Sequence, residues 1–308
     1  MSSLGKSFAS EMEARAIPGW LEDLPVDEVG DPTTSRQVSK FVYTVAAATP
    51  AERARCLLTS LPVLNMLGVS ERVAQGQEFA ACMSGASPLL DRKAHPPVAH
   101  NYCGHQRGLF SGQLGDGAVI SLGRFRNAAP GGSDSYELQL KGSGPTPFSN
   151  GKDGASASPH TVWDAPFSPA SPHALSHTLM TPPRPTRALT LHVFTRRRPH
   201  QGRKSVRASI REFLCCEYLA AVGIPTARAV SVCVSSGTVV LRDEFQAGRT
   251  KAESTGVLAR LAPSFLRFGS FQTFNPTGTT TPPVPLFFLP FPSLSSCPSL
   301  SCPERLNY

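Results

Sequence analysis

The sequence predicts an α+β fold in which a largely antiparallel sheet carries one packed helix. Two observations predict this class. Short alternating or β-branched apolar runs outnumber helical patterns, and the strands do not alternate with helices as they do in a doubly wound parallel sheet. With 308 residues and 40% hydrophobic content, the chain is long enough for one large globular domain or two ordinary ones.

The first half of the chain predicts one helix and two strands. The apolar pattern over Ala51–Leu67 predicts a helix that is interrupted near Pro62. The glycine-rich stretch 112–117 precedes a predicted strand at Ala118–Leu122. Residues Tyr136–Lys141 alternate strictly between polar and apolar, so they predict a half-buried strand that ends on a lysine.

A helix is predicted over Ser205–Val222, and Gly223 and Pro225 end it. Its predicted apolar face consists of Ile210, Phe213, Leu214, Tyr218 and Ala221. Because residues three and four apart share one face of a helix, we expect these side chains to pack on the sheet.

The residues after this helix predict three strands. Ala229–Val234 and Thr238–Arg242 are apolar and β-branched, and Ser235–Gly237 between them predicts a hairpin turn. Gly256–Leu261 predicts the third strand. The order is then glycine loop, strand, strand ending in lysine, helix, strand, hairpin strand and strand. A nucleotide-binding lobe of the protein kinase type has this order.

Two segments differ in composition from the rest. Residues 155–202 hold eight prolines in 48 positions and five of the eight histidines, which show no metal-ligand spacing, so they predict disorder rather than a metal site. In the tail 275–308, fifteen of the sixteen residues of Pro285–Leu300 are Phe, Leu, Pro or Ser. Codons with pyrimidines in their first two positions encode these four residues. We hypothesise that both segments are translated introns, which sequencing of the transcript would test.

Charge and cysteine content exclude several classes of protein. Half of the net charge of +8 comes from residues 155–202, and the remaining charge is ordinary for a protein surface, so no nucleic-acid partner is predicted. No apolar run is long enough for a membrane span. None of the eight cysteines forms a Cys-x-x-Cys pair, which favours reduced thiols in an intracellular protein over a zinc site or a disulfide scaffold.

Gly115 and Gly117 are candidates for contact with phosphate groups. Backbone N–H groups at glycines can approach phosphate oxygens closely because no Cβ intervenes. The order Gly-x-x-Gly-x-Gly matches neither the dinucleotide-binding fingerprint nor a Walker A loop. A glycine-rich β-turn without a ligand therefore remains the alternative.

Charged side chains farther along the chain supply the context of a nucleotide site. Lys141 ends the second strand, where a kinase-like lobe has the lysine that contacts phosphates. Such a lysine is held by a helix glutamate, for which Glu212 and Glu217 are the candidates, and both could instead be solvated surface residues. Arg260 and Arg267 flank an Ala-Pro-Ser turn and could clamp a polyphosphate or form structural salt bridges.

Four blocks of the chain resemble the selenoprotein O family of protein adenylyltransferases: NYCGHQRGLFSGQLGDGAVISLG, YELQLKGSGPTPFS, SIREFLCCEYLAAVGIPTARAVSV and LARLAPSFLRFGSF. The resemblance covers roughly residues 35–154 and 203–274. It implies a kinase-like fold that binds ATP in a reversed orientation and transfers AMP to Ser, Thr or Tyr of protein substrates. It also implies ATP, with Mg²⁺ or Mn²⁺, as the cofactor.

The resemblance implies that ATP contacts Gly115, Gly117, Lys141, Asp153, Gly154, Arg260 and Arg267. It also implies that Glu212 pairs with the lysine. Two features depart from the family. Bacterial members often have an arginine where this chain has Ala118. Members also join Asp-Gly directly to Arg, whereas residues 155–202 separate Gly154 from Arg203 here, and rejoining them restores the pattern.

The chain is therefore expected to have five parts: an N-terminal extension (1–34), the first part of a kinase-like lobe (35–154), an insertion (155–202), the remainder of the lobe (203–274) and a low-complexity tail (275–308). The family's catalytic aspartate and its Mg²⁺ ligands lie in a C-terminal lobe beyond the resembling region. No catalytic residue or metal ligand is assigned, and that lobe is expected to be missing.

The expected function is AMP transfer from ATP to protein hydroxyls, by a chain that is incomplete. The alternative is a catalytically inactive ATP-binding fragment or a mis-spliced product. A conventional kinase is not expected, because the chain contains neither the Asp-Phe-Gly nor the His-Arg-Asp block. Eukaryotic relatives imply a mitochondrial location, and a cytoplasmic one is the alternative.

Overall fold

The computed structural model describes residues 7–149, except 29, 39, 107–108 and 132–133, together with residues 202–243 and 250–273. Side chains are described there outside 105–111 and 241–250. The predicted tail, the predicted insertion apart from Gly202, and the site candidates Asp153 and Gly154 lie outside the described residues.

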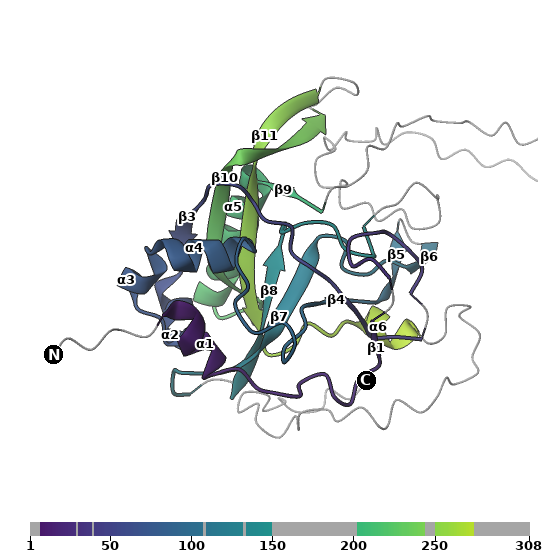
Figure 1. The fold of residues 1–308 in the computed structure, drawn as a ribbon, viewed down its shortest axis with the longest axis horizontal. Helices are drawn as coiled ribbons and strands as arrows, with labels where there is room; N and C mark the ends of the chain where they lie inside the picture. Colours follow the sequence, from purple (N-terminus) through teal and green to yellow (C-terminus); the bar gives the residue numbers. More distant parts are fainter. Residues whose placement is uncertain are drawn as a thin grey trace, which may run out of the picture.

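The fold is α+β, with a mostly antiparallel sheet and few helices (Figure 1). Within the described residues the main sheet has nine strands, of which only β1 and β2 pair in parallel. Its order is β1 (Val26–Asp27), β2 (Tyr43–Val45), β4 (Val98–His100), β7 (Val119–Arg126), β8 (Ser135–Lys141), β11 (Thr250–Ala262), β10 (Arg228–Asp243) and β3 (Ala54–Thr59). The short β9 (Lys204–Ser205) pairs with β11, and β5 (Cys103–Gln106) and β6 (Leu109–Gln113) form a separate antiparallel pair.

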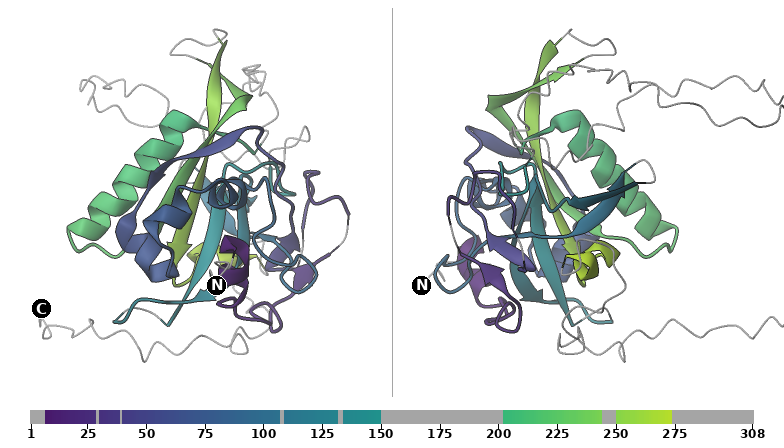
Figure 2. Two further views of the ribbon diagram at one scale, coloured as in Figure 1. Left: turned by 60° about the vertical axis from the view of Figure 1, so that its left-hand side comes forward. Right: turned by 90° about the vertical axis from the view of Figure 1, so that its right-hand side faces the viewer.

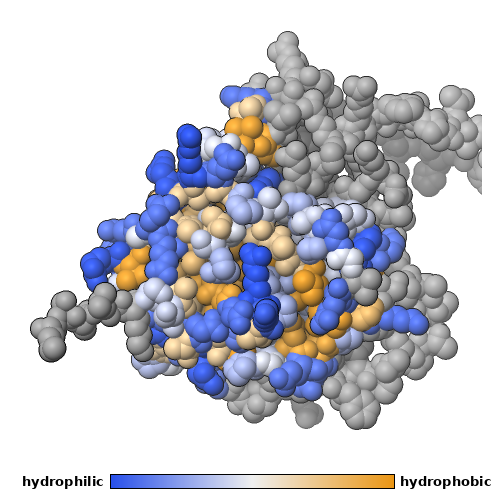
Figure 3. All heavy atoms as spheres, viewed as in Figure 1, coloured by the Kyte–Doolittle hydropathy of each residue, from blue (hydrophilic) through white to orange (hydrophobic). Residues whose placement is uncertain are grey.

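Helices cover both faces of the sheet. They are α1 (Phe8–Glu13), α2 (Leu61–Leu67), α3 (Glu71–Ala74), α4 (Gln77–Ser84), α5 (Val206–Ala221) and α6 (Phe268–Gln272). The right-hand view of Figure 2 shows α5, in green, on one side of the sheet and α1, in purple, on the other. On the face viewed in Figure 3, charged and polar residues are interspersed with apolar ones.

Each face of the sheet has its own apolar core. The larger core joins α1, α2 and α4 to the sheet and includes Met12 of α1 and Leu138 and Leu140 of β8. The smaller core joins α5 to β10 and β11 through Phe213, Cys216, Ala229, Val232 and Leu258. The sequence range expected to be an N-terminal extension thus contributes α1 to the larger core.

Local signals account for the ends of α5. The Ser205 side chain accepts a hydrogen bond from the Ala208 N–H, as an N-cap residue does. At the other end, Gly223 adopts a left-handed conformation with φ +82°, which stops the helix. The predicted helix over Ser205–Val222 is therefore confirmed within one residue at each end.

The buried face of α5 differs from the predicted one. Leu214 and Tyr218 are 58% and 67% exposed, whereas Phe213 and Cys216 are buried against the sheet. The helix lies at the edge of the molecule and buries only a narrow stripe. Apolar residues outside that stripe remain exposed because no described element covers them.

The predicted helix over Ala51–Leu67 is wrong in its first half, where Ala54–Thr59 forms the strand β3. Its second half is confirmed as α2, with Pro62 in the first turn. Among the described strands, β3 lies at the edge of the sheet and pairs with β10 alone, which is far along the chain. Local periodicity could not reveal such a distant partner.

The predicted hairpin is also wrong, because Arg228–Asp243 forms the single strand β10. Its register with β11 shifts between Val234 and Val239, so the small residues 235–237 accommodate an irregularity rather than a chain reversal. The strand predicted at Tyr136–Lys141 is confirmed as β8, but it is buried on both faces rather than on one. It lies in the middle of the sheet, between β7 and β11.

Candidate functional site

The candidate site lies on the α5 face of the central strands. Leu138 and Leu140 of β8 point into the larger core, so alternation places Glu137, Gln139 and Lys141 on the opposite face. Arg260 of β11 lies between two residues of the larger core and therefore also points to the α5 face. The sheet thus presents its polar central positions toward α5.

An ion-pair network joins three of the predicted site residues. The Nζ of Lys141 lies 2.7 Å from Glu212 Oε2 and 2.8 Å from Oε1. Arg260 Nη1 donates to the same Oε1 at 2.9 Å. One carboxylate from α5 therefore holds two cations from two neighbouring strands.

Burial and charge act against each other in this network. Burial alone raises the pKa of Glu212, but the positive charges of Lys141 and Arg260 outweigh it and bring that pKa below its ordinary value. The pKa of Lys141 is lowered, first by burial and then by the charge of Arg260, against the opposing effect of Glu212. Glu212 is thus ionised at neutral pH.

Arg260 has two further neighbours. Its Nη2 donates to Gln139 Oε1 at 2.9 Å, and its guanidinium carbon lies 5.2 Å from the centre of the Phe265 ring. Its Nε has no hydrogen-bond partner among the described residues. A buried donor of this kind calls for an acceptor from outside the described chain.

Arg267 lies beside the glycine loop. Its Nη2 is 3.5 Å from Asp116 Oδ1, and its guanidinium carbon lies 4.6 Å from the centre of the Tyr102 ring. Asp116 is buried, whereas the Arg267 side chain is 42% exposed. The negative charge of Asp116 also acts on Lys141, so Arg267 and the ion-pair network share one electrostatic neighbourhood.

The two loop glycines have a packing role. Gly115 has φ +62°, and a Cβ added there would collide with the Phe148 ring, while one added at Gly117 would lie 2.8 Å from the Phe148 carbonyl oxygen. The Gly115 N–H donates to Tyr102 O at 3.0 Å, and the Gly117 N–H donates to Gly115 O at 3.2 Å. Both N–H groups are therefore engaged within the chain.

Glu217, the other candidate partner for the lysine, has a different set of contacts. It accepts hydrogen bonds from Arg228 Nε and Nη2 at 3.0 and 2.8 Å, from Ser60 Oγ at 2.6 Å and from the Ala229 N–H at 2.9 Å. Glu217 thus ties the C-terminal half of α5 to β10 and to the start of α2.

Three residues of the site carry no sequence motif that marks them: Gln139, Asp116 and Tyr102. Gln139 could have been found from the alternation of β8, which places it on the same face as Lys141. Asp116 could have been found from its place between Gly115 and Gly117. The position of Tyr102 under Arg267 follows from the tertiary structure alone.

Buried titratable groups border the site. His100 of β4 stacks on Tyr43 at 4.9 Å between ring centres and lies edge-on to Tyr102 at 5.7 Å, and burial lowers its pKa to about 4. Burial also raises the pKa of Glu137 to about 7. His100 is therefore neutral at physiological pH, and Glu137 is poised to titrate there.

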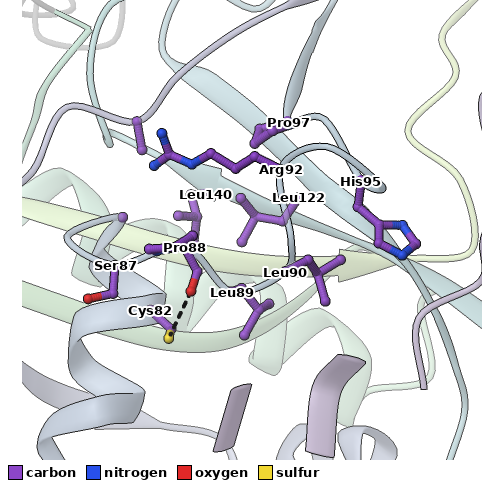
Figure 4. A pocket seen from close by; sticks show the side chains of 12 residues that line it. Cys82, Ser87, Pro88, Leu89, Leu90, Arg92, His95, Pro97, Leu122 and Leu140 are labelled. Atoms are coloured by element: carbon purple, nitrogen blue, oxygen red, sulfur yellow. Dashed lines mark hydrogen bonds between the residues drawn. The ribbon is translucent and has the colours of Figure 1, made fainter. Parts of the chain in front are cut away.

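A pocket with an empty volume of about 380 Å³, part of it open to solvent, lies elsewhere (Figure 4). Its lining includes Leu122, Leu140, Cys82 and His95, and Cys82 Sγ donates to the Pro88 carbonyl oxygen at 3.7 Å. Because Leu140 and Cys82 belong to the larger core, this pocket is on the opposite face of the sheet from Lys141.

The part of the chain that the structure describes contains no group of three or more His, Cys, Asp or Glu side chains that could hold a metal ion. Its six cysteines are free thiols. None of its helices has both the length and the apolar character required to cross a membrane.

Comparisons with known proteins show related sequences. The family model described as "Protein adenylyltransferase SelO" matches residues 29–162 and 196–281. "Protein adenylyltransferase SelO, mitochondrial" of Mus musculus is 38% identical over 257 residues, covering 82% of this chain and 30% of that protein. The Homo sapiens protein of the same name is 36% identical over 261 residues, covering 85% and 31%.

"Protein nucleotidyltransferase YdiU" of Aromatoleum aromaticum is 35% identical over 253 residues, covering 81% of this chain and 38% of that protein. The chain therefore spans between 30% and 38% of the length of these curated relatives.

Proposed function

Because the chain belongs to the SelO family of protein adenylyltransferases, we propose that its ion-pair network and Arg267 bind the triphosphate of ATP for transfer of AMP to protein hydroxyls. We also propose that the described residues form a kinase-like nucleotide-binding lobe, and that the family's catalytic residues lie in a C-terminal lobe outside them.

One observation carries the proposal: Lys141 and Arg260 share the single carboxylate of Glu212. Lys141, Arg260 and Glu212 together bear a net positive charge, and their side chains are partly buried. A phosphate oxygen supplies the missing negative charge, and it can accept from the Arg260 Nε, which lacks a partner among the described residues. Arg267 pairs weakly with Asp116 and is exposed enough to turn toward a ligand.

The network suits nucleotidyl transfer chemically. In that reaction the substrate hydroxyl oxygen forms a bond to the α-phosphorus, the bond to the β-phosphate oxygen breaks, and pyrophosphate leaves. Lys141 and the two arginines would neutralise charge on the triphosphate, and Glu212 would hold Lys141 and Arg260 in place. The base that accepts the hydroxyl proton is not among the residues assigned here.

Magnesium or manganese is expected to accompany ATP. The described residues offer no ligand set that fits a resident divalent ion. When bound, it would reduce the charge of the triphosphate.

The remaining predicted ATP contacts stay in the proposal. The family pattern implies contacts of the phosphates with Gly115 and Gly117, and contacts of ATP with Asp153 and Gly154. The family-model match leaves out residues 163–195, which supports the proposal that 155–202 is an insertion. The names of the mammalian relatives support a mitochondrial location, and the acceptors would be Ser, Thr or Tyr of proteins.

Nucleotide binding tests the proposal first. We expect Lys141→Ala to weaken ATP binding about tenfold or more in isothermal titration calorimetry, because a charge-assisted contact is lost. Lys93→Ala, an exposed lysine outside the site, is the matched control and should bind like the wild type. Equal ATP affinity in all three proteins would refute the site.

Transfer is tested with α-labelled ATP, Mg²⁺ or Mn²⁺ and a protein acceptor. Label that moves to the acceptor, and no longer does so in Lys141→Ala, would support adenylyl transfer by this chain. ATP binding without transfer of label would instead support the ATP-binding fragment.

A further inference from the structure

Gln139 is fully buried at the centre of the candidate site. It lies on β8, where its register partners are Ser121 on β7 and Arg260 on β11. These three residues form a row across three neighbouring strands, and directly opposed side chains in a sheet are close enough to bond. Among the described residues, Arg260 forms side-chain hydrogen bonds with Glu212, which is charged, and with Gln139, which is not.

The two ends of the Gln139 amide have different partners. Its Nε2 donates to Ser121 Oγ at 3.0 Å, and its Oε1 accepts from Arg260 Nη2 at 2.9 Å. Rotating the amide by half a turn would place its NH₂ group against the guanidinium, donor facing donor. Because the Arg260 guanidinium only donates, it selects the orientation in which Gln139 offers an acceptor, and Ser121 Oγ receives the other end of the amide.

The Gln139 contact restricts the orientation of the Arg260 guanidinium. Glu212 on α5 and Gln139 on β8 each hold one of its terminal nitrogens, so two elements fix the guanidinium plane. An arginine side chain loses much of its rotamer entropy when it is immobilised. Here that cost is met in folding rather than on binding a ligand.

Packing alone does not explain a glutamine at this position. Burying an amide costs more than burying a side chain of similar volume without polar atoms, unless the amide is fully hydrogen-bonded. The neighbouring positions on the other face of β8 are leucines. A position that only filled the core would be served as well by leucine or methionine.

We propose that Gln139, anchored by Ser121, is a positioning residue that holds Arg260 ready for the triphosphate. This inference rests on the proposed function, because it concerns the same site. Gln139 itself does not touch the nucleotide. Its effect on ATP binding therefore passes entirely through Arg260.

The test is a double-mutant cycle on ATP affinity, measured by isothermal titration calorimetry on the full chain. Gln139→Met removes the acceptor at nearly constant volume and should weaken ATP binding about tenfold. Arg260→Ala should weaken it at least as much. In the Arg260→Ala background, Gln139→Met should cause no further loss, because the arginine through which it acts is gone.

Ser121→Ala supplies a second, milder variant. Without the serine hydroxyl the amide loses the partner of its Nε2 and is held less firmly against Arg260, so the Kd should rise about twofold. Ser231→Ala is the matched control: it removes a buried serine hydroxyl from β10, outside the row, and should leave the Kd unchanged. If Gln139→Met does not fold, the cycle is run with Ser121→Ala and Arg260→Ala.

The outcomes separate the two proposals. Wild-type protein that does not bind ATP, or binds it independently of Lys141, overturns the proposed function and the inference with it. Lys141-dependent binding that Gln139→Met leaves unchanged overturns the inference alone. Equal losses from Gln139→Met with and without Arg260 also overturn it, because the glutamine would then act by general packing.

Discussion

Individual buried residues have charge states that differ from those they would have in water. Glu137 is the clearest case, since burial raises its pKa from the ordinary 4.5 to about 7. The Phe265 N–H, which donates to Glu137 Oε2 at 3.1 Å, and the charge of Arg124 oppose the shift, whereas Asp116 adds to it. The carboxyl also anchors the turn between Arg260 and Arg267.

This shift predicts a pH-dependent effect of Glu137→Gln. The folded protein holds the Glu137 proton up to pH about 7, while the unfolded chain loses it near 4.5, so this group's contribution to stability falls as pH rises between those values. Glutamine keeps an acceptor for the Phe265 N–H and carries no charge. The variant should therefore exceed the wild type in free energy of unfolding by up to about 3 kcal/mol at pH 8.

Urea unfolding at pH 4 and pH 8 measures this effect. At pH 4 both proteins carry a neutral side chain at position 137, and the difference should nearly vanish. A difference that is the same at both pH values would contradict the pKa shift and point to packing instead.

At the scale of elements, two glutamates of α5 tie the helix to different strands of the sheet. Glu212 connects its middle to β8 and β11, and Glu217 connects its C-terminal half to β10 through Arg228 and Ala229. The two glutamates lie five residues apart, so they project in different directions and serve different strands.

We expect Glu217→Ala to lower the free energy of unfolding by about 2–3 kcal/mol, because it leaves the Arg228 guanidinium and the Ala229 N–H without their acceptor. Chemical denaturation measures the loss. Glu253→Ala is the matched control, since it breaks an ion pair to Arg207, a more exposed residue of the same helix, and should cost less than about 1 kcal/mol. Similar losses in the two variants would show that Glu217 is not an anchor.

At the scale of the whole molecule, the C-terminal flank of the predicted insertion, Gly202 and Arg203, packs against two earlier stretches of the chain. Arg203 Nη2 donates to the carbonyl oxygens of Thr49 and Pro50 at 2.8 and 3.1 Å, and Ser143 and Arg203 form an isolated β-bridge. Gly202 has φ +62°, and a Cβ there would collide with the Gly144 carbonyl. If residues 155–202 were removed, Gly154 would supply the glycine that this place needs.

A variant that joins Gly154 directly to Arg203 is therefore expected to fold. Its free energy of unfolding should rise by about 2 kcal/mol, because closing a shorter loop costs less entropy. ATP binding should be retained or tightened. Urea unfolding and calorimetry measure both quantities.

A variant in which 48 Gly and Ser residues replace 155–202 serves as the control for loop length. Its free energy of unfolding and its ATP affinity should equal those of the wild type if residues 155–202 contribute only their length. Loss of folding or of ATP binding on joining Gly154 to Arg203 would contradict the interpretation of this segment as an insertion.

The sequence by itself determined the elements whose signals are local. The ends of α5 follow from the Ser205 cap and from Gly223, and the alternation of β8 decides that Lys141 and Gln139 share a face. The α+β class follows from the same short patterns. The family pattern further singled out Glu212 over Glu217 as the partner of the lysine.

Only the tertiary structure decided features that depend on distant partners. β3 became a strand because β10 lies beside it, and 235–237 became an irregularity in β10 because β11 continues alongside. Leu214 and Tyr218 stayed exposed because nothing described covers them. The hydrogen bond from Arg260 to Gln139 exists because β8 and β11 pair in one register, and a register between distant strands is set by the sum of contacts across the whole sheet, which no local window of sequence contains.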